Sequence, residues 1–93
     1  MSTKFLTFGT LEYVERLNNS VNGNPRYECR VALDAPERTP GGVVAGRTLR
    51  GKTASDAMFA YQMPYAGTPV KVIYHVTARG VVVFDNIEVR YHA

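Results

Sequence analysis

The sequence contains few of the residues from which disulfides and metal sites are built. Its 93 residues include one cysteine, Cys29, two histidines, His75 and His92, and no tryptophan. One cysteine cannot form an intramolecular disulfide, and two distant histidines are too few for a zinc site. We therefore expect no metal and no other cofactor. Cys29 lies on the apolar side of an alternating run, so we expect a small buried side chain in a reducing compartment, and not a nucleophile.

Long apolar runs and a strong net charge are also missing. No stretch approaches the roughly 20 apolar residues of a membrane-spanning helix, and the first ten residues, MSTKFLTFGT, do not look like a secretory signal. We therefore expect a cytoplasmic protein that does not contact membranes. Lys and Arg number 11 against 8 Asp and Glu, a net charge of +3. This mild excess would help an anionic partner approach, although many soluble domains carry it without such a partner.

The composition that remains is typical of one small globular domain covering residues 1–93. Hydrophobic residues make up 45% of the chain and charged residues 20%, unlike the polar, highly charged composition of disordered chains. Alternation of apolar and polar residues predicts five strands, over residues 4–17, 26–33, 43–53, 70–77 and 81–91. We expect irregularities at Gly9 and at Asp85-Asn86. In the first strand, Gly9, Leu11 and Tyr13 share one side. In the second strand, the side that should face the core holds Tyr27, Cys29, Val31 and Leu33. In the third, Leu49 and Gly51 lie opposite Thr48, Arg50 and Lys52. In the fourth, Val70, Val72, Tyr74 and Val76 lie opposite Lys71, Ile73, His75 and Thr77.

A short helix is expected between the third and fourth strands. Thr53 or Ser55 can cap it, and Pro64 ends it. The order strand, strand, strand, short helix, strand, strand is that of a small five-stranded antiparallel OB-like barrel. An SH3-like barrel, or a curled sheet packed on the helix, would give nearly the same sequence pattern. The fold class is therefore mainly β with one short helix.

Residues 46–53 (GRTLRGKT) match the P-loop pattern of nucleotide-binding enzymes. Such a loop belongs to a parallel sheet whose strands are joined by helical crossovers, each unit taking roughly 30 residues. Only one short helix is predicted here, and the tight turn at residues 78–80 requires antiparallel neighbours. Nucleotide binding at residues 46–53 is therefore the least favoured hypothesis, and no other set of residues indicates catalysis. We expect a protein that is not an enzyme.

Basic residues near aromatic residues form the one repeated chemical theme. In an OB barrel, single-stranded nucleic acid crosses the middle strands, where bases stack on aromatic rings and basic groups contact phosphates. The alternative is a solvated strand face with half-buried tyrosines. The residues expected to bind nucleic acid or another partner are Arg26, Tyr27, Arg30, Arg50, Lys52, Tyr61 and Tyr65.

Three segments carry a resemblance to a protein family: NGNPRY at residues 22–27, SDA at residues 55–57 with Tyr61, and YAGTPVKV at residues 65–72. Over roughly residues 10–85 the chain resembles a group of small proteins encoded by actinobacteria and by the phages that infect them. The resemblance implies an origin and not an activity. It favours a phage-type accessory protein that binds and modulates a host protein in the host cytoplasm.

Two hypotheses thus remain beside the P-loop. The favoured one is a non-enzymatic module that binds a host protein, and the alternative is an OB-like barrel that binds single-stranded nucleic acid. Because small barrels with free strand edges often dimerise, a homodimer is also compatible with the sequence.

Overall fold

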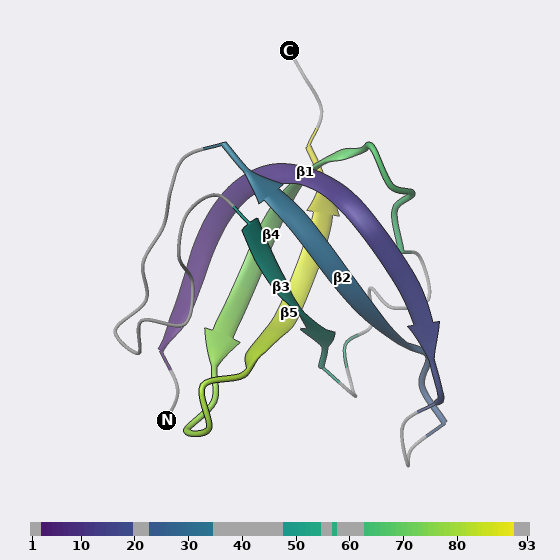
Figure 1. Cartoon of the computed structure of the whole chain (residues 1–93), viewed down its shortest axis with the longest axis vertical. Helices are drawn as coiled ribbons and strands as arrows, with labels where there is room; N and C mark the ends of the chain where they lie inside the picture. The colour runs from purple at the N-terminus through teal and green to yellow at the C-terminus, as the bar shows by residue number, and fades with distance from the viewer. Residues whose placement is uncertain (1–2, 20–22, 35–47, 55–56, 58–62, 91–93) are drawn as a thin grey trace.

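The computed structural model describes residues 3–19, 23–34, 48–54, 57 and 63–90. Five strands are present in this part of the chain, as the alternation predicted (Figure 1). They are β1 (Lys4–Leu17), β2 (Arg26–Leu33), β3 (Thr48–Thr53), β4 (Pro69–Val76) and β5 (Val82–Val89). Residues 43–47 of the expected third strand lie outside the described residues.

The strands form a closed barrel in the order β1-β2-β3-β5-β4. The long strand β1 arches over the barrel (Figure 1), pairing with β4 from Lys4 to Thr10 and with β2 from Gly9 to Leu17. The mainly-β, five-stranded barrel is therefore confirmed, and it is consistent with a small OB-like barrel.

The expectation that all strand pairs are antiparallel is wrong at one place. Strands β3 and β5 pair in parallel, at Lys52 with Val83 and at Thr53 with Phe84. A ring with an odd number of strands cannot alternate in direction all the way round, so at least one neighbouring pair must be parallel. Closing five strands into a barrel therefore requires this exception.

Most of the expected helix between Thr53 and Pro64 falls on residues 55–56 and 58–62, which lie outside the described residues. Thr53 ends β3, and the Ala54 N–H donates to the carbonyl oxygen of Phe84 at 2.9 Å, which continues the β3–β5 pairing. No helix is present in the part of the chain that the structure describes.

The core lies inside the barrel and is filled from the inward side of every strand. Tyr74 and Phe84 are its largest fully buried side chains, and the partly buried ring of Phe5 stacks on Tyr74 with 5.4 Å between ring centroids. The inward sides predicted for β2, β3 and β4 are confirmed. The other fully buried large side chains are Leu11, Cys29, Val31, Leu49, Val70 and Val72.

A β-bulge in β1 changes which side chains face the core. The register with β2 shifts between Leu11 and Tyr13, so Glu12 is the additional residue. Beyond it Val14 packs against the core, while Tyr13 is 38% exposed. The sequence pattern put Tyr13 on the same side as Leu11, and that prediction is wrong because a bulge reverses the alternation.

The irregularity expected at Gly9 has another form. A β-carbon at Gly9 would lie 2.3 Å from the carbonyl oxygen of Ala32, so β1 and β2 approach each other too closely there for any side chain. The second irregularity is confirmed, because the register between β4 and β5 shifts around Asp85. Phe84 and Ile87, on either side of this bulge, both remain buried.

Candidate binding surfaces

The outward side of β1, β2 and β3 beyond the β1 bulge carries most of the residues that the sequence singled out, and we call it the front face. Two rows of register partners cross it: Tyr13, Arg30 and Arg50 form the first row, and Glu15, Glu28 and Lys52 form the second. Glu12 lies beside the first row. The register therefore brings Arg30, Arg50 and Lys52 together, as expected for a binding surface.

Carboxylates pair with both arginines of this face. Arg50 directs its Nε and Nη2 at one oxygen of Glu28, at 3.0 and 2.9 Å. Arg30 Nε lies 3.4 Å from Glu12 Oε1, and the Arg30 guanidinium lies 5.9 Å from the centroid of the Tyr13 ring. Exposed pairs of this kind contribute little to folding stability. Their main effect is that acidic groups partly neutralise the front face.

The Tyr13 hydroxyl donates a hydrogen bond to Glu15. This bond, followed by desolvation and the nearby carboxylate charges, raises the pKa of Tyr13. Tyr13 thus remains a neutral aromatic side chain on this face over the physiological pH range.

Two further basic side chains have donors available. Lys52 is exposed and makes no ion pair with any residue that the structure describes. Arg26, the first residue of β2, is half-buried beside Leu17, and its Nε is enclosed without a hydrogen-bond partner among the residues that the structure describes.

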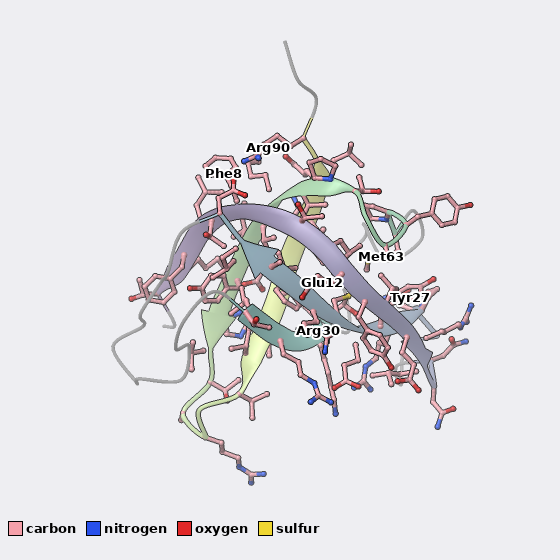
Figure 2. The ribbon with its side chains drawn as sticks, turned by 45° about the horizontal axis from the view of Figure 1, so that its top comes forward. Phe8, Glu12, Tyr27, Arg30, Met63 and Arg90 are labelled. Carbon is pink, nitrogen blue, oxygen red and sulfur yellow. The ribbon has the colours of Figure 1, made fainter. Side chains whose placement is uncertain are left out.

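Tyr27 and Tyr65, the two predicted tyrosines that the structure describes, do not join the front face. Tyr27 turns inward beside the core, as Met63 does, and its backbone N–H donates to Thr53 Oγ1 at 3.0 Å (Figure 2). Tyr65 is 87% exposed but lies in the segment that leads into β4. This segment is held beside β1 by a hydrogen bond from the Leu11 N–H to the carbonyl oxygen of Thr68. Tyr61 lies outside the described residues. Tyr13, which the sequence pattern had placed on the same side as Leu11, is the aromatic residue that the described part of the front face presents.

The described part of the P-loop match, residues 48–53, forms strand β3. Gly51 is buried where β3 passes β5, and a β-carbon there would lie 2.4 Å from the carbonyl oxygen of Val82. Lys52 points outward from the same strand. Because the backbone from Thr48 to Thr53 is extended and paired with β2 and β5, it does not wrap round a phosphate as a P-loop does.

A second surface, which sequence reasoning missed, lies on the outward side of β4, β5 and the first half of β1. We call it the back face. Leu6 and Phe8 are 56% and 40% exposed, and Ile73 is the register partner of Leu6. The apolar residues at 5, 6 and 8 could have pointed to it, but the sequence pattern does not show which of them face outward.

Two ion pairs and a histidine–aspartate contact surround this apolar centre. Lys71 and Glu88 lie 2.9 Å apart, and His75 Nδ1 lies 2.7 Å from Asp85 Oδ2. Arg90 pairs with Asp34 at 2.9 Å while its guanidinium lies 5.2 Å from the centroid of the Phe8 ring (Figure 2). Hydrogen bonds from Lys71 and then Asn86 lower the pKa of Glu88.

Other chemical possibilities receive little support from the structure. Burial raises the pKa of the Cys29 thiol to about 12, so this cysteine is a poor nucleophile. No three His, Cys, Asp or Glu side chains gather to hold a metal ion in the described ranges. Within the same ranges, no helix has the length and apolar character that crossing a membrane requires.

The fold and its surfaces define a small closed β-barrel with one charged face and one apolar face. No protein-family model matches the chain, and no curated protein matches it significantly. Function must therefore be inferred from the surfaces themselves.

Proposed function

We propose that this protein is a non-enzymatic binding module that takes single-stranded nucleic acid across its front face. The observation that carries the proposal is the uneven distribution of charge among the described side chains. The part of β1 beyond its bulge, β2, β3 and the β4–β5 loop together hold the basic residues Arg16, Arg26, Arg30, Arg50, Lys52 and Arg79, against the acidic residues Glu12, Glu15 and Glu28. On the back face the basic residues Lys4, Lys71 and Arg90 are matched by Asp34, Asp85 and Glu88.

The position of the basic excess supports an anionic polymer as the partner. OB barrels bind oligonucleotides over their second and third strands and over the loops that join β1 to β2 and β4 to β5. Both loops lie at the same end of this barrel (Figure 1), with Arg26 after the first loop and Arg79 in the second. Arg30, Arg50 and Lys52 lie on the strands between them. This likeness concerns the fold alone, so the charge distribution is the stronger support.

Fluorescence anisotropy with a labelled single-stranded oligonucleotide tests the proposal. We expect binding at low salt that weakens steeply as salt rises, because each phosphate neutralised by Lys or Arg releases counterions. Lys52→Gln, at an exposed side chain with no ion pair to any described residue, should weaken binding and lower the salt slope by about 0.7, the value for one phosphate of a single strand. The matched control is Lys71→Gln, which removes one positive charge from the back face. Absence of binding to the wild type at low salt would refute the proposal.

A protein partner is the second candidate, and the exposed apolar side chains Leu6 and Phe8 favour it. An apolar centre enclosed by already paired charges resembles a protein–protein interface. Together with the resemblance to proteins of actinobacteria and their phages, it supports an accessory protein that docks an uncharged, apolar surface of a host protein. Its site of action would then be the host cytoplasm.

Capture from host lysate after nuclease treatment tests this candidate. A specific partner should bind the wild type and Val81→Lys, a control at an exposed apolar side chain in the loop between β4 and β5. Leu6→Lys should lose the partner, and the loss should be reproduced with the purified partner. Equal capture by the wild type, Val81→Lys and Leu6→Lys would show that the partner does not bind the back face. If the wild type sediments as a dimer and Leu6→Lys as a monomer, the occupant is a second copy of this chain.

A further inference from the structure

The carboxylate of Glu28 occupies the Nε–Nη2 edge of Arg50, one of the two edges at which a guanidinium can take a phosphate. Two of the three guanidinium nitrogens, Nε and Nη2, reach the same Glu28 oxygen. A bidentate phosphate contact uses such a fork of two N–H groups. The Glu28 side chain is 21% exposed and that of Arg50 69% exposed, so the carboxylate lies close to the sheet beneath a projecting guanidinium. A phosphate must therefore displace Glu28 or bind next to its negative charge.

The β1 bulge places a second acidic residue in a similar position. Because Glu12 is the additional residue, it and Tyr13 both reach the front face and both contact Arg30. Bulges are known to redirect side chains in this way. The Arg30–Glu12 contact, at 3.4 Å, is longer than the Arg50–Glu28 contacts.

We infer that Glu28, and to a smaller extent Glu12, are specificity-determining residues that compete with nucleic-acid phosphates for Arg50 and Arg30. This inference rests on the proposed function of the front face. The two carboxylates keep the affinity for nucleic acid low. The native barrel therefore binds a single-stranded nucleic acid only where several of its phosphates make contact at once.

The experiment compares Glu28→Gln with Glu88→Gln in the anisotropy assay. Both substitutions remove one negative charge from a glutamate paired at 2.9 Å with a basic residue, on the front and the back face respectively. Glu28→Gln should tighten binding of the labelled oligonucleotide roughly fivefold to tenfold and steepen the salt dependence by about one phosphate. Glu88→Gln should leave the affinity within about twofold of the wild-type value, because exposed charges far from the bound oligonucleotide are screened by salt.

Two further variants exclude a change in folding as the explanation. Glu12→Gln should tighten binding by a smaller factor. The gain from Glu28→Gln should disappear when it is combined with Arg50→Gln, because the competed group is then missing. Circular dichroism should show the same folded spectrum for all variants.

The outcomes separate this inference from the proposed function. If the wild type binds and Glu28→Gln binds equally well, the inference is wrong and the proposed function stands. Equal tightening by Glu88→Gln would also overturn it, because net charge alone would then account for the gain. If only Glu28→Gln binds, the inference holds and the proposed function of the native protein fails. If neither protein binds, both are wrong.

Discussion

Cys29 and Gly51 lie opposite each other in the register between β2 and β3, and each is explained by the packing around it. Cys29 contributes a fully buried thiol to the core. Gly51 leaves the space through which the backbone of β5 passes at Val82. At this scale, the requirement for a small or an apolar side chain comes from a neighbour that is distant in the chain.

Cys29 should be almost unreactive in the folded protein. Its pKa of about 12, against an ordinary value near 9, lowers the thiolate fraction at pH 8 about a thousandfold. Iodoacetamide at pH 8 should therefore label the native protein very slowly and the urea-unfolded protein readily, as followed by mass spectrometry. Rapid labelling without urea would contradict the buried position.

The same pKa shift predicts how stability depends on pH. The folded state holds the thiol proton up to about pH 12, whereas the unfolded state loses it near pH 9. Above pH 9 the unfolded state therefore binds fewer protons, and the free energy of unfolding contributed by Cys29 falls as pH rises. Urea midpoints at pH 8 and pH 10.5 should show a larger decrease for the wild type than for Cys29→Ala.

Gly51→Ala should be among the more destabilising single changes in the protein. The added methyl would lie 2.4 Å from the carbonyl oxygen and 2.9 Å from the Cγ1 of Val82, and because the oxygen belongs to the backbone, β3 or β5 must move. We expect a loss of about 1–3 kcal/mol in the free energy of unfolding, the range for overpacking, measured by urea titration. Lys52→Ala, at the exposed neighbouring position, should cost less than about 0.5 kcal/mol. Equal effects would show that β3 and β5 are not in close contact.

At the scale of the element, the bulge of β1 decides which side chains reach the front face. Val14→Gln should cost about 1–3 kcal/mol, because a polar group would replace an apolar side chain packed on the core. Tyr13→Gln, the same substitution one residue earlier, should cost less than about 1 kcal/mol. Thermal or urea unfolding measures both. If Tyr13→Gln cost more than Val14→Gln, the side chain of Tyr13 and not that of Val14 would face the core, and the bulge at Glu12 would be wrong.

At the scale of the whole molecule, closure of the barrel depends on its shortest pairing. Strands β3 and β5 share two register pairs and the bond from Ala54 N–H to Phe84, whereas β1 and β2 pair from Gly9 to Leu17. Local opening of the barrel should therefore begin between β3 and β5. Native-state hydrogen exchange should show less protection at the Ala54 amide than at amides in the middle of β2. Equal protection would mean that the barrel opens only by global unfolding.

Binding, too, is a property of the whole molecule. Net charge and tyrosine positions, read along the chain, predicted a basic aromatic surface that included Tyr27 and Tyr65. The barrel instead turns Tyr27 inward, leaves Tyr65 on another loop and pairs Arg30 and Arg50 with carboxylates. Arg30, Arg50 and Lys52 could be predicted because they alternate on their own strands. Glu12, Glu28 and Tyr13 could not, because their part in the surface depends on cross-strand register and on the bulge.

Local pattern alone determined the five strands, the inward sides of β2, β3 and β4, and the irregularity at Asp85. These features depend on a two-residue alternation that is complete within a few neighbouring residues. The tertiary structure alone decided the parallel β3–β5 pair, the bulge at Glu12, the Arg50–Glu28 contact and the outward Leu6 and Phe8. Each of these depends on how strands distant in the sequence meet round a closed ring, where an odd number of strands and the register between them set constraints that no single strand carries.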